Sequence, residues 1–380
     1  MTPGERAARS VDEAAPRLLE LSHALSADPE LAYQEHRAAE RCAALLAEHG
    51  FAVERGAYGL PTAFAARLGS SGPNVVVCAE YDALPGVGHA CGHNVIAAAA
   101  LGAGVALAPL VEEVGLRLTV LGTPAEEVGG GKVDLIRAGA FDGVDAAMMV
   151  HPTPYDEYAP RALAIEEWRV VHRGRASHAS SEPHLGLNAL DGIVQGYTSI
   201  AMLRQHLRPL QQVHGVIVDG GAAANVVPER AEASYFLRAA DLDDLDDLRN
   251  RVRGCFEGAA AATGTTVEIT VEGHVYEPLL PHAGLVDAFT AACEAIGRSF
   301  TADPRGDSIA GSTDFGNVSQ LVPGLHADLA VHSWPAVNHQ HEFAAACVAE
   351  GGDRAVLDGA KALALTALAV AEDPGLLSRR

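Results

Sequence analysis

The segment Gly88–Asn94 offers the densest metal-binding chemistry in the chain. Cys91 and His93 stand two positions apart in it, shortly after an apolar, strand-like stretch at 74–79. Because alternate residues of an extended backbone project to the same side, both side chains can converge on one point. A thiolate and an imidazole are ligands that a zinc-like cation selects, although a single Cys-x-His pair also occurs without metal.

Two further apolar stretches end in potential ligands, the first in Glu126-Glu127 and the second in His151. Helical or Gly-rich segments separate the three stretches, which is typical of strands in a parallel sheet. Such sheets bind ligands in the crevice beyond the carboxyl ends of their strands. We therefore expect these side chains to meet Cys91 and His93 at one edge of a sheet, which favours a metal site over chance.

The adjacent glutamates stand in an unusual place for residues that only confer solubility. Glu126 and Glu127 follow a strand-like stretch and precede three consecutive glycines at 129–131. Neighbouring side chains diverge, so the two carboxylates are not expected to be equivalent ligands. We expect one of them to bind metal and the other to take a proton from a metal-activated water.

Helical and strand patterns must position these residues. The stretch 5–49 predicts two helices that separate at Asp28-Pro29 and end at Gly50. From there to His151 strand and helix patterns alternate, which predicts a largely parallel sheet.

The pattern changes near Ala164. Residues 164–272 follow a β-α-β-β-α-β order, which is typical of a small α+β domain, and patterns of the first kind resume at Leu285. We therefore expect an α/β fold with a mixed, largely parallel sheet flanked by helices. Residues 1–163 and 273–380 carry this fold, and the α+β domain at 164–272 is inserted into it.

An acidic run at 241–247 could suggest a calcium loop. It lacks the loop glycine and the terminal glutamate that such a loop needs. Acidic residues in the first turn of a helix complement the helix dipole. We interpret the run as the start of a helix in which Leu242, Leu245 and Leu248 face inward.

Composition limits the class of protein. At 380 residues, two domains are the better expectation. A net charge of −22 without any basic run argues against nucleic acid and disfavours anionic membranes. The six cysteines show no disulfide framework, so we expect reduced thiols and a cytoplasmic location. The polar N-terminus shows no signal peptide, and the apolar stretch 95–111 predicts a buried helix rather than a membrane span.

Motifs spread along nearly the whole chain resemble those of a known family. The chain resembles the aminoacylase and dipeptidase family of two-metal peptidases, peptidase family M20. Within it, the chain is most similar to the amidohydrolase branch that includes aminobenzoyl-glutamate hydrolase and the β-alanyl-dipeptide hydrolases. The matching segments are residues 80–85, 88–94, 122–132, 151–152, 174–179, 186–191, 220–221, 225–228, 237–238, 311–319 and 338–339. The resemblance implies a zinc-exopeptidase-like catalytic domain with an inserted lid or dimerisation domain.

The resemblance implies two divalent metal ions per chain, zinc or manganese, with cobalt as a further option. The family's ligand positions fall on Cys91, His93, Glu127, His151 and His339. Cys91 stands where other branches carry a bridging carboxylate, so the resemblance implies that its sulfur bridges the two ions.

The resemblance also implies catalytic and substrate-binding positions. Glu126 matches the general base, and Asp82 matches a carboxylate that orients a metal ligand. His178 matches a histidine that stabilises the oxyanion and reaches the partner subunit's site in dimers of this family. Asn225 and Arg238 match positions that hold substrate, Arg238 as a fork for a carboxylate. The implied assembly is a homodimer formed through the inserted domain.

Several of these assignments have rivals within the sequence. His339 competes with His332 and His341, and we favour His339 because it best fits the family's closing motif. Arg238 could instead pair with an acidic residue of the insert. Glu80 occupies a position where other branches carry a histidine ligand, and we leave its role open.

The implied activity is hydrolysis of the amide bond that joins an acyl, aminobenzoyl or β-aminoacyl group to an amino acid. The substrate would be a small N-acyl amino acid or dipeptide. Asn94 points to the dipeptidase and aminobenzoyl-glutamate side of the branch, but His184 stands where those relatives usually carry Trp. A dedicated biosynthetic deacylase is therefore an alternative. Less favoured interpretations are a thiol hydrolase with Cys91 as nucleophile and a non-catalytic paralogue.

Overall fold

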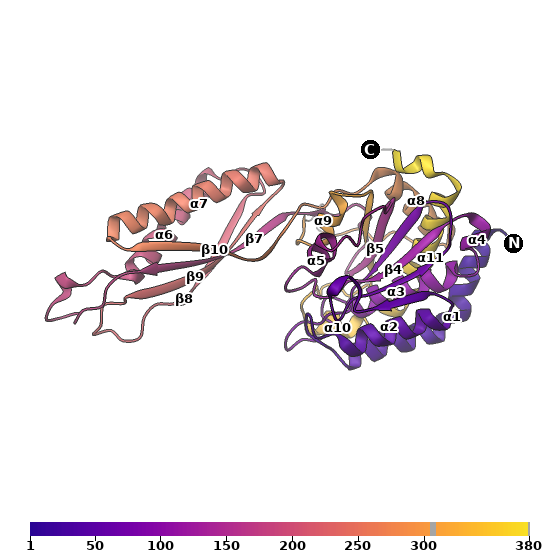
Figure 1. The fold of residues 1–380 in the computed structure, drawn as a ribbon, viewed down its shortest axis with the longest axis horizontal. Helices are drawn as coiled ribbons and strands as arrows, with labels where there is room; N and C mark the ends of the chain where they lie inside the picture. Colours follow the sequence, from indigo (N-terminus) through magenta and orange to yellow (C-terminus); the bar gives the residue numbers. More distant parts are fainter. Residues whose placement is uncertain (305–308, 379–380) are drawn as a thin grey trace. The chain divides into compact units, whose positions relative to one another are not determined.

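The computed structural model of the chain describes residues 1–304 and 309–378 (Figure 1). The chain divides into two compact units. The first unit contains Met1–Arg161, Leu279–Ala310 and Asp314–Arg380, and the second contains Ala162–Pro278 and Gly311–Thr313. Each unit has its own buried apolar core.

A six-stranded sheet forms the centre of the first unit, in the order β1-β2-β4-β3-β5-β12. Strands β4, β3, β5 and β12 run parallel, whereas β1 and β2 are antiparallel to their neighbours. The strands are β1 (Ala52–Arg55), β2 (Phe64–Leu68), β3 (Asn74–Ala79), β4 (Arg117–Gly122), β5 (Ala146–Thr153) and β12 (Gly324–Ala330). The predicted fold, a mixed and largely parallel sheet flanked by helices, is confirmed.

The helices of this unit include the two that were predicted at the N-terminus. The first begins with a capping box, in which Thr2 and Glu5 each accept a backbone N–H of the other. The helices are α1 (Pro3–Ala27), α2 (His36–Glu48), α3 (His93–Leu107), α4 (Val111–Val114), α5 (Gly131–Arg137), α8 (Ala283–Ala295), α9 (Phe315–Ser319), α10 (His341–Ala346) and α11 (Glu350–Glu372), with short 3₁₀ turns η1 (Ala57–Gly59) and η4 (Pro374–Ser378).

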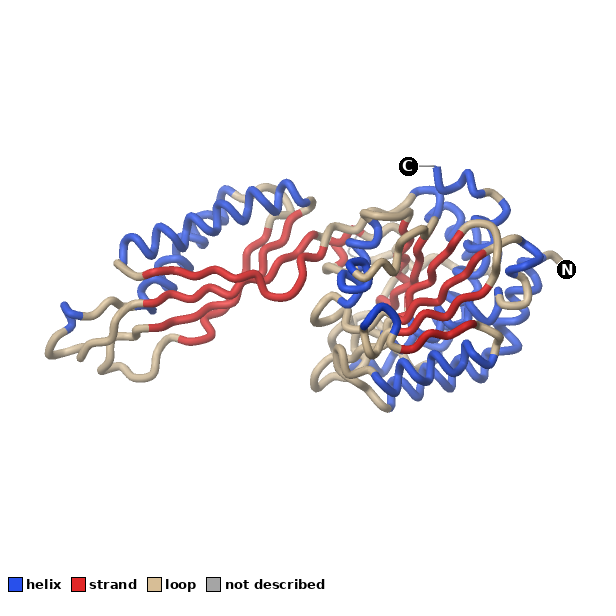
Figure 2. Tube along the Cα trace, in the orientation of Figure 1, coloured by secondary structure: helices blue, strands red, loops and turns tan. Residues whose placement is uncertain are grey.

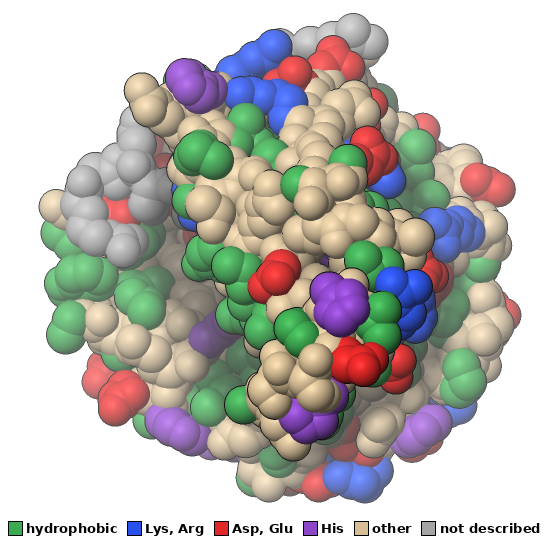
Figure 3. Space-filling model, turned by 90° about the vertical axis from the view of Figure 1, so that its left-hand side faces the viewer, with side chains coloured by type: hydrophobic (Ala, Val, Ile, Leu, Met, Phe, Trp, Pro, Cys, Tyr) green, Lys and Arg blue, Asp and Glu red, His purple; other side chains and the backbone are tan. Residues whose placement is uncertain are grey.

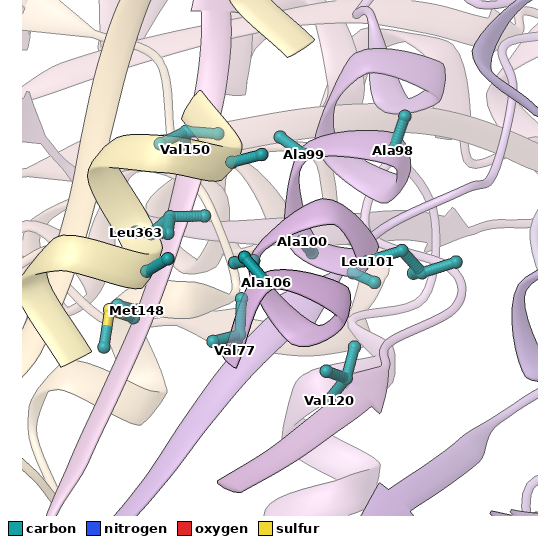
Figure 4. Close-up of a cluster of buried hydrophobic side chains, with 14 of the residues drawn as sticks. Val77, Ala98, Ala99, Ala100, Leu101, Ala106, Val120, Met148, Val150 and Leu363 are labelled. Atoms are coloured by element: carbon teal, nitrogen blue, oxygen red, sulfur yellow. The ribbon is translucent and has the colours of Figure 1, made fainter. Parts of the chain in front are cut away.

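Helix α3 is buried along its whole length between the sheet and helices α1 and α11. Its small residues allow this close packing: a Cβ on Gly102 would lie 2.6 Å from the Cβ of Ala360 in α11. Figure 4 shows Ala98 to Leu101 and Ala106 of α3 among apolar side chains of β3, β4, β5 and α11. The predicted buried helix is thus confirmed, and no helix among the described residues is long and apolar enough to cross a membrane.

The second unit is a four-stranded antiparallel sheet in the order β10-β7-β9-β8, with helices α6 and α7 packed against it and against each other (Figure 2). The β-α-β-β-α-β order is the predicted one. The elements are β7 (Ala164–Arg173), α6 (Ala189–Leu203), β8 (Gln212–Asp219), β9 (Arg230–Ala239), α7 (Leu242–Thr263) and β10 (Thr266–Tyr276), with 3₁₀ turns η2 (Pro183–Leu185) and η3 (Arg204–His206). Two short strands, β6 (Arg161–Ala162) and β11 (Ile309–Ala310), complete the described elements.

The acidic run begins α7, as predicted. The Asp241 side chain accepts the backbone N–H of Asp244 and caps the helix. Leu245 and Leu248 are buried, but Leu242 is exposed. The prediction for Leu242 was wrong because this first residue of the helix precedes the turn that faces the core.

On the face drawn in Figure 3, basic side chains are scattered among acidic ones.

Candidate metal centre

The loop between β3 and α3 carries the Cys-x-His segment. Gly92 caps α3 in a left-handed conformation, with φ +80°, and a Cβ at this position would lie 2.3 Å from Cγ of Pro152. Only glycine meets both conditions, so the sequence permits this tight entry into the helix. Consequently Cys91 lies in the loop and His93 is the first residue of α3, and both side chains are buried.

His151 approaches Cys91 from β5. Its Nε2 lies 3.5 Å from the Cys91 Sγ, and its Nδ1 lies 3.1 Å from the Pro152 carbonyl oxygen. The carbonyl can only accept, so Nδ1 carries the proton and Nε2 directs its lone pair toward the sulfur. His151 was expected just beyond the strand, but β5 continues to Thr153 because β12 pairs with it over that length.

Glu127 and His339 lie on another side of Cys91. Nε2 of His339 is 3.6 Å from Oε2 of Glu127, and the His339 backbone N–H donates to the Ala90 carbonyl at 2.8 Å. His339 adopts a left-handed backbone, with φ +71°. This one backbone bond therefore ties the C-terminal loop to the loop of Cys91, although the two are far apart in the sequence.

The side chains form two groups that share one sulfur. Cys91, His93 and His151 have potential ligand atoms within 4.8 Å of one another, and so have Cys91, Glu127 and His339. Two cations could therefore sit on either side of Cys91. A further group, Glu80 with His93 and Glu126, meets the same distance limit among the described residues.

Unpartnered buried atoms show that the residues present fit a cation. Among the described residues, the buried atoms His93 Nε2 and Glu127 Oε1 have no hydrogen-bond partner. Buried polar atoms without partners are costly, and native proteins rarely leave them so. Because both atoms belong to the two groups around Cys91, a bound cation would supply the missing partner.

Asp82 contacts one residue of each of the two ligand groups that share Cys91. Its Oδ1 lies 3.0 Å from His93 Nδ1, and its Oδ2 accepts the Glu127 backbone N–H at 3.0 Å. Burial alone would raise the pKa of Asp82, but His93 and the Glu127 N–H lower it overall. The carboxylate therefore stays ionised and fixes the His93 tautomer whose Nε2 faces the cluster.

Glu126 is buried beside the same cluster. Its Oε2 lies 3.9 Å from His93 Nε2. Burial raises the pKa of Glu126 well above its usual value, and the charges of Glu80 and Glu127 add to the effect. A carboxylate with a raised pKa is suited to accept and return a proton.

A buried lysine beside the cluster, Lys132, belongs to a segment that matches the family, but no role was predicted for it. Nζ of Lys132 lies 2.5 Å from Glu80 Oε1 and 2.7 Å from Asp314 Oδ1, and all three side chains are buried. The ammonium offsets part of the negative charge that Glu126 and its neighbours concentrate here. One oxygen of Glu80 is thus engaged by a lysine, and the other, Oε2, lies 3.4 Å from His93 Nε2.

Two further buried residues were also missed. The His326 ring stacks on His151 at 5.4 Å between centroids. Glu35 accepts the backbone N–H of Ala125, the residue before Glu126, at 2.9 Å. No local pattern in the sequence marks either residue, because both act through partners from distant segments.

The structure distinguishes the three histidines that were considered for the last metal-ligand position. His339, and neither His332 nor His341, belongs to a potential metal-binding group among the described residues. His89 is buried, and burial lowers the pKa of its imidazole to about 4. His89 likewise lies outside those groups.

The expected residues of the second unit lie at two ends of its sheet. His178 is exposed on the loop after β7, and the adjacent Ala179 donates its N–H to the Asn225 carbonyl at 3.0 Å. Arg238 lies near the other end, in β9, and its Nη1 donates to Ser312 Oγ at 2.8 Å. The described residues include no acidic partner for Arg238.

The chain belongs to peptidase family M20/M25/M40, whose model matches residues 76–369. It is therefore a hydrolase that acts on amide bonds, and the resemblance found in the sequence is confirmed.

Curated relatives cover nearly all of the chain. It is 42% identical to the Xaa-Arg dipeptidase of Mus musculus, over 98% of this chain and 90% of that protein. It is 35% identical to a p-aminobenzoyl-glutamate hydrolase chain of Escherichia coli, over 71% of this chain and 60% of that one.

Solved structures share the fold. A putative aminohydrolase from methicillin-resistant Staphylococcus aureus superimposes with a TM-score of 0.81 at 20% identity, covering 96% of this chain and 99% of that one. A dinuclear metal-binding M20 peptidase of Bacillus subtilis superimposes with a TM-score of 0.74 at 20% identity, covering 95% and 99%.

Proposed function

We propose that the chain is a two-metal dipeptidase or amidohydrolase. Cys91, His93, Glu127, His151 and His339 would hold the two ions, with Cys91 belonging to both ligand groups. The observation that carries this proposal is the sharing of the Cys91 sulfur between the group with His93 and His151 and the group with Glu127 and His339. One thiolate and three imidazoles suit zinc, with manganese or cobalt as alternatives. When bound, the ions would lower the pKa of a water molecule and polarise the amide carbonyl.

The protein's own residues would then move the protons. Glu126 takes the proton of the attacking water and returns it to the leaving amine, for which its raised pKa is suited. Asp82 keeps His93 and the Glu127 backbone in position. Burial of Asp82, His93 and Glu126 excludes competing water around the base and strengthens these interactions.

A dipeptide with a basic C-terminal residue is the favoured substrate. Similarity to Xaa-Arg dipeptidases over 98% of the chain supports this choice. Arg238 is suited to bind the terminal carboxylate, because it is partly buried and donates to a hydroxyl rather than to an acid. An aminobenzoyl-glutamate substrate is the second candidate, supported by the relative from Escherichia coli.

A substrate panel tests this proposal. Metal-reconstituted protein should hydrolyse Xaa-Arg and β-alanyl dipeptides with a higher kcat/KM than p-aminobenzoyl-glutamate or N-acetyl amino acids. A clear preference for one N-acetyl amino acid would instead favour a dedicated biosynthetic deacylase. No hydrolysis of any compound, in protein that still gains thermal stability from metal, would indicate a non-catalytic paralogue.

We also propose that the second unit, which corresponds to the insert expected at 164–272, is the lid and dimerisation domain. The first unit, expected at 1–163 and 273–380, is then the catalytic domain. Strand β8 lies at the edge of the sheet and exposes Val216, Ile217 and Val218. An exposed apolar edge strand invites pairing with another chain. A homodimer formed through this edge would bury these residues. The free thiols of all six cysteines suit a cytoplasmic location.

The positions of His178 and Arg238 support a site shared between two chains. Arg238 lies eight positions along β9 from Arg230, which pairs with Arg173 at the end nearer His178. The two ends are therefore roughly 26 Å apart. One chain therefore cannot bring both side chains to one small substrate. His178 Nδ1 accepts the N–H groups of Ser180 and Ser181, which leaves Nε2–H as a donor for an oxyanion.

Mixing two inactive variants should restore activity. His178→Ala and Glu126→Gln are each expected to be inactive, but a mixed dimer contains one site with both residues intact. Random exchange of subunits should restore roughly a quarter of the wild-type rate. Rates would be measured after the two variants are unfolded and refolded together, with each variant refolded alone as the control. If the mixture stays inactive although mixed dimers form, His178 does not act on the partner's site.

A further inference from the structure

We propose that Glu35 is a positioning residue for the general base, because its carboxylate fixes the backbone immediately before Glu126. The inference rests on the proposed function, in which Glu126 moves the proton. It adds a residue that lies about ninety positions upstream and outside every motif of the sequence.

Glu35 is fully buried and is bound to the loop that carries the base. Its Oε1 accepts the backbone N–H of Ala125 at 2.9 Å and that of Tyr33 at 2.9 Å. The described residues offer no ion-pair partner to this carboxylate, and burial raises its pKa to about 7. Burial of a carboxyl group without a cation is costly. The backbone N–H groups of Tyr33 and Ala125, together with the Thr62 side chain, offset part of this cost.

Ala125 needs such a restraint. It has a φ of +60°, a strained left-handed conformation that a residue with a Cβ rarely adopts. Its carbonyl accepts the N–H groups of Gly130 and Gly131 at 3.0 and 3.2 Å, which closes the loop. The bond from Ala125 N–H to Glu35 therefore holds a strained residue next to the base.

A second buried carboxylate acts on the other side of the base. Asp82 Oδ2 accepts the N–H of Glu127 at 3.0 Å. The residues before and after Glu126 are thus each bound through their N–H to a buried carboxylate, Glu35 on one side and Asp82 on the other. We name this pair the carboxylate clamp. It fixes the direction in which the Glu126 side chain leaves the backbone.

Helix capping does not explain why a buried carboxylate stands at position 35. It stands at the N-cap of α2, but its side chain makes no capping bond. Glu30 serves the start of that helix instead, since its Oε2 accepts the N–H groups of Arg37 and Ala38 at 2.8 Å each. Glu30 is also buried, so it offers a matched control with a structural role in the same helix.

The test compares three variants of the metal-loaded enzyme on the best substrate of the panel. Glu35→Ala should lower kcat by about 10- to 100-fold, with KM and metal content unchanged, because a small displacement of a catalytic group costs rate rather than binding. Glu35→Gln should keep most of kcat, since its amide oxygen accepts the same N–H. Glu30→Ala should lower the unfolding temperature and leave kcat close to that of the wild type.

A kcat of Glu35→Ala equal to that of the wild type, at full metal content, would overturn the proposal. An equal loss of kcat in Glu35→Ala and Glu30→Ala would also overturn it. If Glu35→Ala does not fold, Glu35→Asp replaces it: the shorter carboxylate cannot reach Ala125, so its kcat should fall below that of Glu35→Gln. Equal kcat in these two variants would again contradict the clamp. Failure of the proposed function looks different, because Glu126→Gln would then remain active.

Discussion

Glu126→Gln should lower kcat by about 10³-fold while the protein keeps both of its metal ions. Glutamine has the same shape as glutamate but cannot accept a proton from water. The residue belongs to neither of the two groups that share Cys91, so its replacement should leave the ions in place. Steady-state kinetics and metal analysis of the same preparation measure the two effects.

Glu127→Gln is the matched control for this experiment. Glu127 belongs to the group with Cys91 and His339, so its replacement should lower the metal content as well as kcat. A Glu126→Gln variant with more than about a tenth of the wild-type kcat would contradict its role as the base. Loss of metal from Glu126→Gln alone would instead make Glu126 a ligand.

Cys91→Ala is expected to have the other large effect. The sulfur belongs to both groups, so its removal should release both ions and lower kcat/KM by at least about 10³-fold. Cys42→Ala is a suitable control, because Cys42 is a buried cysteine of α2 outside both groups. Metal analysis and kinetics should find this control close to the wild type.

A chelator separates this account from a thiol hydrolase. Wild-type protein should lose activity when metal is removed and regain it when zinc or manganese is restored. Burial raises the pKa of the Cys91 thiol well above its usual value, which opposes a free thiolate nucleophile without metal. Activity that survives complete metal removal would revive the thiol hydrolase.

The convergence of the ligands could be predicted because local signals determine it. The stretch 74–79 became β3 with the predicted bounds, and glycines such as Gly92 mark where the chain turns into a helix. The carboxyl ends of parallel strands lie at one edge of a sheet, so Cys91, Glu127 and His151 had to be neighbours. Most residues of the candidate site could therefore be predicted from residue type and spacing.

The supporting residues could not be predicted, because their partners are distant in sequence. Lys132 binds Asp314 across 182 positions, and Glu35 binds Ala125 across 90. Neither contact leaves a periodic pattern. His178 and Arg238 lie at opposite ends of the second unit's sheet. This follows from the strand register, which a short sequence motif does not reveal.

The central claim is that one sulfur, from Cys91, lies between two cations. Anomalous diffraction from crystals of the zinc-loaded protein tests it most directly. We expect two peaks about 3.5–4 Å apart, each about 2.3 Å from the Cys91 sulfur, one beside His93 and His151 and the other beside Glu127 and His339. A single peak, or ions held by Glu80 and Glu126 away from Cys91, would contradict the account.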